Sequence, residues 1–173
     1  MKYFTLLFLV LPLALSQTSC FQVKAKEPVV FRFEHGKTAM LKDGLAYAPK
    51  RAPKAVIRAI AAGNRLQGKP YKWGGGHARF QDSGYDCSGT VSYVLREAGL
   101  MKGCIPSRNY FKYGNRGYGD WITVYVRDGH VFMTIAGLRL DTGGDGSNSG
   151  SGPRWKPQRR GVQGFIVRHP SGY

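Results

Sequence analysis

The sequence predicts an α+β domain in which helices come first and a run of antiparallel strands follows. Two amphipathic helical patterns occupy residues 54–66 and 87–100, and short strand-like runs follow between residues 121 and 168. Gly137 stands between two of these runs as the turn of a hairpin. This order favours N-terminal helices packed on a central antiparallel sheet.

The first 50 residues predict an export signal followed by a connecting segment. Residues 1–16 have the short apolar run and small residues of an export signal, with an uncleaved membrane anchor as the alternative. Cys20 could carry a lipid, in which case the signal extends to residue 19, although Gln17 stands where a lipidation motif has an apolar residue. We expect residues 17–50 to form an arm or linker, and residues 51–173 to form one domain.

Composition points to an anionic partner. The chain has 173 residues and a formal net charge of +16, of which Lys2 alone lies in the predicted signal. Such a field attracts polyanions, and nucleic acid is the usual candidate. An exported protein instead meets the peptides and anionic polymers of the cell wall. We therefore expect a protein of the periplasm or cell envelope, with no nucleic-acid partner.

The predicted elements follow one another along the chain. The first helix is amphipathic with basic residues between its apolar ones, and the second has Val91, Val94, Leu95 and Ala98 on one face. Strands are expected at residues 121–126, 130–136, 138–141 and 164–168. Residues 141–152 are rich in glycine, serine and aspartate, which is typical of a loop.

Cys87 is the candidate nucleophile. It follows the glycine-rich segment that contains Tyr71 and Trp73, and it begins the second predicted helix. A helix N-terminus stabilises a thiolate, and small neighbours let a substrate approach the backbone. The alternative is a buried structural thiol, because free cysteine is among the most buried residue types.

His130 is the candidate base for this thiol. It begins a predicted strand after Gly129, and a strand end can aim the imidazole at a neighbouring helix. A core histidine and a metal ligand are the alternatives, but no other histidine or cysteine lies at ligand spacing. Asp141 ends the strand that would pair with that of His130, so we expect the two to face each other and Asp141 to orient the ring. A turn-forming role is the alternative for Asp141, and Gln163 and His169 are its substitutes as orienting group.

Other polar and aromatic residues are candidates for contact with substrate or transition state. Tyr71 could donate a hydrogen bond to an oxyanion. Asp86 could contact substrate or cap the helix, and Trp73 could contact substrate or fill the core. A basic cluster follows the loop, and it either lines the site and binds carboxylates or forms a solvated face. The expected substrate-binding residues are Trp73, Asp86, Ser88, Arg154 and Trp155, with Arg159 and Arg160 beside the last two.

Three motifs together resemble the NlpC-type peptidoglycan peptidases, a papain-like family of cysteine endopeptidases. They are Tyr71-x-Trp-Gly-Gly, Asp86-Cys-Ser-Gly and Gly129-His-Val, and the resemblance runs from about Arg58 to Asp141. It implies that Cys87 is the nucleophile, His130 the base and Tyr71 the tyrosine that assists the oxyanion. The family usually has His, Asn or Gln as its third polar residue, and Asp141 departs from that pattern.

The resemblance implies an exported enzyme that hydrolyses amide bonds in peptidoglycan stem peptides without a metal or other cofactor. One rival is an amidase or acyltransferase on the same scaffold. The other is a basic envelope-binding protein in which Cys87 and His130 have no catalytic role. Thiol reactivity separates the enzymes from the binding protein, because a nucleophile is alkylated faster than a buried structural thiol.

Overall fold

The computed structural model describes residues 36–143, 151–157 and 160–173. The predicted signal, Cys20, most of the loop at 141–152, and Arg159 lie outside these ranges. No helix in the described ranges is long and apolar enough to span a membrane.

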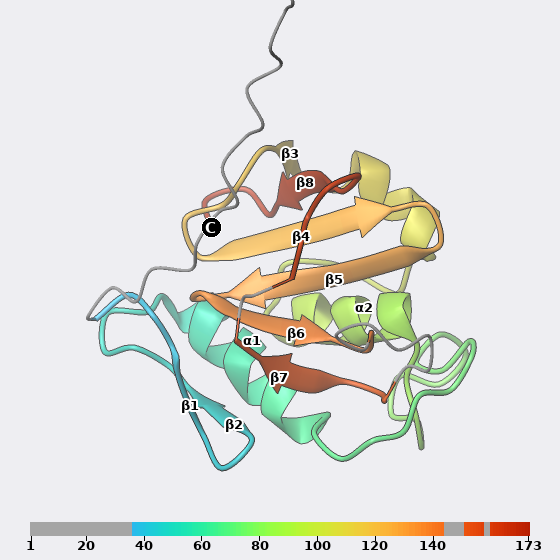
Figure 1. Cartoon of the computed structure of the whole chain (residues 1–173), viewed down its shortest axis with the longest axis horizontal. Coiled ribbons are helices and arrows are strands. Elements are labelled where there is room, and N and C mark those ends of the chain that lie inside the picture. The colour runs from blue at the N-terminus through green and yellow to red at the C-terminus, as the bar shows by residue number, and fades with distance from the viewer. Residues whose placement is uncertain (1–35, 144–150, 158–159) are drawn as a thin grey trace, which may run out of the picture.

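The centre of the fold is a six-stranded antiparallel sheet (Figure 1). The strand order is β3-β8-β4-β5-β6-β7. The strands are β3 Asn115–Arg116, β4 Ile122–Arg127, β5 His130–Ile135, β6 Leu138–Asp141, β7 Arg154–Lys156 and β8 Ile166–His169. The four strands expected from sequence are present, and β6 has the predicted bounds. The short strands β3 and β7 were not predicted.

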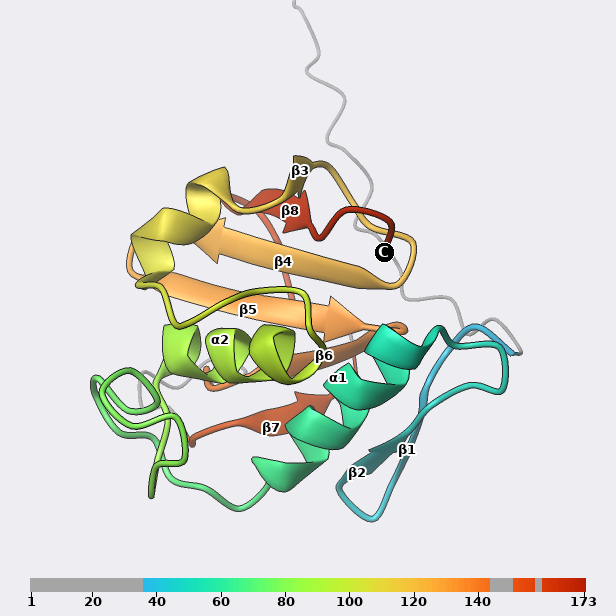
Figure 2. The same ribbon diagram turned by 180° about the vertical axis from the view of Figure 1, so that it is seen from behind.

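Two helices cover one face of this sheet, α1 Lys54–Arg65 and α2 Cys87–Glu97 (Figure 2). Their apolar faces join one core with β4, β5 and β6. Helix α2 ends three residues before the predicted end at 100. Gly99 has φ +77° there, and the N–H of Leu100 donates to the carbonyl of Leu95, which closes the last turn. A 3-10 helix, Ser107–Lys112, packs on β4.

Gly63 explains how β7 reaches the core. Glycine inside a helix costs about 1 kcal/mol relative to alanine. A Cβ at Gly63 would collide with the indole of Trp155 on β7, so the absence of a side chain lets the ring lie directly on α1. The Trp155 side chain is 6% exposed, and its Nε1 donates to Asn64 Oδ1 at 2.8 Å.

Residues 36–50, expected as part of an arm, contain a hairpin that docks on α1. Strands β1 Met40–Lys42 and β2 Leu45–Tyr47 are joined by Asp43 and Gly44, which both have positive φ. Asn64 of α1 accepts from the N–H of Ala46 and donates to its carbonyl, each at 2.9 Å. Ala39 and Ala46 belong to the main core. This segment therefore packs as part of the domain.

The β5–β6 hairpin determines how Asp141 meets His130. Ala136 and Gly137 form its turn with φ values of 44° and 83°, as a two-residue hairpin turn requires. Met133 pairs with Leu140, and the same register continued by one residue sets Asp141 opposite Phe132. Asp141 is therefore the diagonal neighbour of His130 on the same face, rather than its direct partner as expected.

Candidate active site

Cys87 is the first residue of α2 and is partly buried. Asp86 precedes it as the N-cap, and its Oδ1 accepts from the N–H of Gly89 at 2.6 Å. Gly89 has no room for a Cβ, because the carbonyl of Gly75 lies against it. The glycine-rich loop is thus held closely against the first turn of the helix, with the thiol at the junction.

Tyr71 and Trp73 lie on the segment that runs beside the nucleophile. Tyr71 forms a parallel β-bridge with Tyr85, two residues before Cys87. Burial raises the pKa of the Tyr71 phenol, and the nearby charges of Cys87 and Asp86 raise it further. The phenol therefore keeps its proton at neutral pH and can donate it. Trp73 is 88% exposed, which excludes a role in the core.

His130 interacts with both Asp141 and Cys87. Its Nε2 lies 3.0 Å from Oδ1 of Asp141, and the nearby Cys87 side chain raises the pKa of the imidazole. Because Nε2 faces Asp141, Nδ1 is the ring nitrogen left for the thiol. The structure thus brings together the thiol, imidazole and carboxylate that the sequence nominated.

The electrostatics favour a protonated imidazole. Burial alone lowers the pKa of His130, but the hydrogen bonds and charges of Asp141 and Cys87 outweigh it and raise the pKa to about 9. Burial alone raises the pKa of Asp141, and the hydrogen bonds from His130 and Gly143 with the charge of Arg160 hold it below its usual value. At neutral pH the pair is therefore an imidazolium and a carboxylate.

Arg160 belongs to this site, although its sequence position suggested a solvated basic face as readily as a place in the site. Its Nη1 donates to Oδ2 of Asp141 at 2.6 Å, and its guanidinium lies over the rings of Phe132 and Phe165 at 5.4 and 5.5 Å. The buried Arg139 lies 3.7 Å from the same carboxylate oxygen. Asp141 is 1% exposed, so these cations offset the cost of burying its charge.

Four of the five expected substrate-binding residues are buried in the protein or hydrogen-bonded to other parts of it. Trp155 is a core residue, so the substrate contact expected of it is wrong. Arg154 donates from Nη1 to the carbonyls of Lys69 and Pro153. Asp86 and Ser88 are buried at the helix start, and their side chains bind one another and the protein. Trp73 remains available on the surface.

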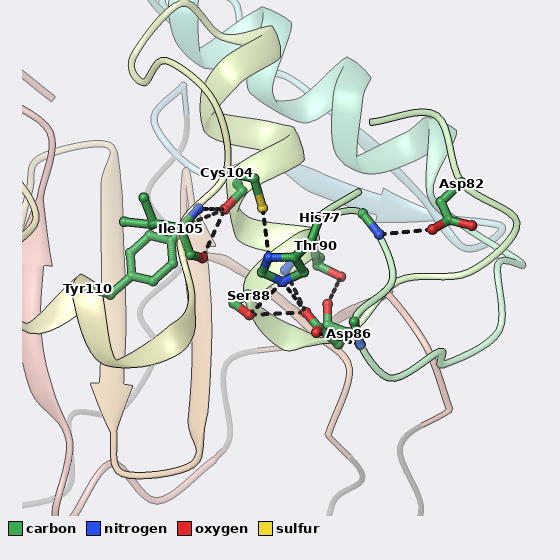
Figure 3. A network of polar contacts seen from close by, with 12 residues as sticks. His77, Asp82, Asp86, Ser88, Thr90, Cys104, Ile105 and Tyr110 are labelled. Atoms are coloured by element: carbon green, nitrogen blue, oxygen red, sulfur yellow. Dashed lines mark hydrogen bonds and ion pairs between the residues drawn. The ribbon is translucent and has the colours of Figure 1, made fainter. Parts of the chain in front are cut away.

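His77 was not predicted as part of any site. Its Nε2 lies 3.1 Å from both Asp86 Oδ1 and Ser88 Oγ, and its Nδ1 lies 3.2 Å from the sulfur of Cys104 (Figure 3). Cys87 and Cys104 are both free thiols. Within the described ranges, no three His, Cys, Asp or Glu side chains form a group that could hold a metal ion.

Comparisons with known proteins bear on the family and the fold of the chain. The model of the NlpC/P60 family matches residues 68–110, which include Cys87 but neither His130 nor Asp141. The solved structure of the peptidoglycan hydrolase RipB from Mycobacterium tuberculosis is 24% identical, with 71% of this chain and 70% of that chain covered and a TM-score of 0.51. This likeness confirms the expected α+β fold of the NlpC type.

A second solved structure from the same organism is that of RipD, described as a non-catalytic NlpC/p60 domain protein adapted to peptidoglycan binding. It is 21% identical, covers 68% of this chain and 98% of its own, and has a TM-score of 0.48. No curated protein matches the chain.

Proposed function

We propose that the chain, whose residues 68–110 match the model of the NlpC/P60 family, is a cysteine peptidase that hydrolyses amide bonds in the stem peptides of peptidoglycan. The observation that carries the proposal is the His130–Asp141 pair, joined at 3.0 Å, with the Cys87 thiol near enough to act on the pKa of the imidazole. A purely structural thiol has no need of an imidazole whose proton is held by a buried carboxylate. RipB, which shares the fold, is a peptidoglycan hydrolase, and this supports peptidoglycan as the substrate.

The chemistry assigns one role to each group. The Cys87 sulfur attacks the carbonyl carbon, and His130 donates its proton to the departing amine as the C–N bond breaks. Water then attacks the thioester, His130 takes one of its protons, and the carboxylate product leaves with the thiol restored. The Tyr71 hydroxyl and the N–H of Cys87 stabilise the negative oxygen formed in each step.

The site of action follows from the sequence alone. The predicted export signal at residues 1–16 takes the protein to the periplasm or cell envelope, where Cys20 could add a lipid anchor. The net charge of +16 favours retention on anionic wall polymers. Both are proposals for this chain, as is the absence of a nucleic-acid partner.

Digestion of purified sacculi tests the function. The wild-type protein should release peptides that mass spectrometry identifies, and a folded Cys87→Ala variant should release none. Full release by Cys87→Ala would exclude the peptidase. Digestion in H₂¹⁸O separates hydrolysis from the rival acyl transfer, because hydrolysis leaves ¹⁸O in the new carboxylate whereas transfer to an amine does not. Binding to sacculi without release would instead favour the envelope-binding protein.

A further inference from the structure

A second thiol, imidazole and carboxylate are hydrogen-bonded in series at the start of α2. The series runs from Cys104 Sγ to His77 Nδ1 at 3.2 Å, and from His77 Nε2 to Asp86 Oδ1 at 3.1 Å (Figure 3). It involves neither His130 nor Asp141. Its carboxylate end stands directly before Cys87 in the chain, and His77 also contacts Ser88, directly after it, at 3.1 Å.

The hydrogen on the Cys104 thiol sets the direction of the hydrogen bonds along this series. The Cys104 sulfur is partly buried, and burial raises the pKa of its thiol, so it keeps its S–H at neutral pH. A thiol that faces Nδ1 at hydrogen-bond distance donates to it. A neutral imidazole has one N–H, and an acceptor Nδ1 leaves that hydrogen on Nε2, where it points at the Asp86 carboxylate. Donor and acceptor are then matched along the whole series.

Asp86 links the two segments that shape the surroundings of Cys87. Its Oδ1 caps α2 through Gly89, and its Oδ2 accepts from the N–H of Gly74 at 3.0 Å in the glycine-rich loop. Both contacts depend on how the carboxylate is turned and on how many donors it has.

We propose that His77 is a positioning residue for Cys87: Cys104 donates to Nδ1, and the Nε2–H that remains holds Asp86 and Ser88 on either side of the nucleophile. The inference rests on the proposed role of Cys87. Loss of the Nε2–H leaves Oδ1 with fewer donors and lets the carboxylate turn. Loss of the Cys104 S–H lets the hydrogen move to Nδ1, which sets the Nε2 lone pair against the carboxylate.

Two matched pairs of variants separate these contacts. The amide of His77→Gln reaches the position of Nε2, whereas that of His77→Asn reaches only the position of Nδ1. Cys104→Ser keeps a donor toward His77, whereas Cys104→Ala removes it. We expect His77→Gln and Cys104→Ser to retain most of the wild-type reactivity. His77→Asn should lose roughly tenfold and Cys104→Ala several-fold, on the scale of one hydrogen bond to a charged group.

The reactivity measured is the rate at which iodoacetamide alkylates Cys87, read by peptide mass spectrometry so that Cys20 and Cys104 are counted separately. This rate needs no substrate, so it stays informative if wall digestion fails and the proposed function is abandoned. On a stem peptide, the same variants should lower kcat and leave KM nearly unchanged. Equal alkylation rates in His77→Asn and His77→Gln would overturn the proposal.

A measurement on the wild-type protein covers the case in which the variants do not fold. The chain has four histidines, so ¹⁵N-histidine spectra can be assigned with single variants. At pH 7 the His77 ring should show hydrogen on Nε2 and none on Nδ1. A hydrogen on Nδ1, or on both nitrogens, would contradict the proposal directly. In folded Cys104→Ala, the Nε2–H signature should weaken, and an unchanged ring would contradict the role proposed for Cys104.

Discussion

Arg160 binds the oxygen of Asp141 that His130 leaves free: Nη1 donates to Oδ2 at 2.6 Å, while Oδ1 lies 3.0 Å from His130 Nε2. The two contacts share one carboxylate, and together they prevent it from turning. Arg160 Nη1 also lies 3.4 Å from His130 Nε2, so its charge acts on both members of the pair. The group that we expect to orient His130 is therefore a carboxylate held by an arginine.

Replacing Arg160 tests this arrangement. Arg160→Gln should lower kcat/KM roughly tenfold, about 1.4 kcal/mol of transition-state stabilisation, because Asp141 then orients His130 less well. Thermal unfolding should show a loss of about 1–3 kcal/mol, since a buried carboxylate loses a cation. Arg160→Lys should recover part of both.

Arg127→Gln is the matched control for that substitution. Arg127 also lies over the Phe165 ring, at 4.9 Å, and it is an exposed residue at the end of β4, where its strand partner is His130. Its removal takes away one positive charge and one ring contact and should leave kcat/KM within about twofold, on the scale of a surface substitution. An equal loss in both variants would mean that charge, rather than the Asp141 contact, sets the rate.

Gly63→Ala should destabilise the protein, although alanine has a higher helix propensity than glycine. Propensity alone predicts a gain of about 1 kcal/mol. The added methyl group would collide with the Trp155 ring, so we expect a net loss of about 1–3 kcal/mol in the free energy of unfolding, measured by urea titration. In a Trp155→Leu background the collision is relieved, and the same substitution should become neutral or stabilising. A gain in the wild-type background would show that β7 does not pack on α1 as described.

The parts of the fold that local pattern determines were predictable. Apolar periodicity gave both helices, and the turn at Ala136 and Gly137 gave a hairpin that brings Asp141 beside His130. The β1–β2 hairpin was predictable too, because Asp43-Gly44 between short apolar runs is a strong hairpin signal. The scattered charge of residues 17–50 favoured an arm or linker without strands of its own, although the turn pair favours a hairpin.

The contacts of His77, Arg160 and Trp155 could not be predicted from sequence spacing. Each depends on where a loop or a short strand crosses a distant element. Trp155 resembled a surface aromatic because it stands among basic residues, and only the missing side chain at Gly63 makes room for it on α1. The signal that could have nominated it is a glycine inside an otherwise good helix. The catalytic roles of Cys87, His130, Asp141 and Tyr71 stay predictions.

Trp73→Ala should weaken substrate binding without affecting the fold. Trp73 is 88% exposed beside the segment that leads to Cys87, so its removal should change the free energy of unfolding by no more than about 0.5 kcal/mol. An exposed indole there offers a large apolar face to a peptide or sugar ring. We expect KM for wall fragments to rise several-fold with kcat nearly constant. Ile57→Ala, at another exposed apolar residue, is the control and should leave KM unchanged.

The pKa of His130 predicts how stability depends on pH. This pKa is raised from 6.5 to about 9, so the protonated ring stabilises the folded state. The contribution is present in full below about pH 6.5 and is lost as the pH rises through about 9. Its size corresponds to about 3 kcal/mol. The difference in unfolding free energy between wild type and His130→Gln should therefore shrink by that order between pH 6.5 and 9.5, and a constant difference would contradict the raised pKa.

Asp141→Asn should shift the high-pH decline of activity to lower pH, because it removes the interaction between Asp141 and His130. The hydrogen bond and charge of Asp141 raise the pKa of His130, so the neutral amide should lower that pKa. His130 must be protonated to release the amine, and kcat/KM therefore falls at high pH as the ring loses its proton. In the wild type we expect that decline near pH 9, and in Asp141→Asn at least about one pH unit lower.

The turnover of Asp141→Asn at its best pH should also fall, because an amide can place its N–H, rather than its oxygen, against Nε2. Asp128→Asn is the control: Asp128 is an exposed turn residue two positions before His130, and asparagine before Gly129 suits the same hairpin turn. It removes one negative charge nearby and should leave the decline near pH 9. If Asp128→Asn and Asp141→Asn shift the profile equally, general surface charge would explain the shift. If neither does, Asp141 does not control the proton on His130, and the orienting role would pass to Gln163 or His169.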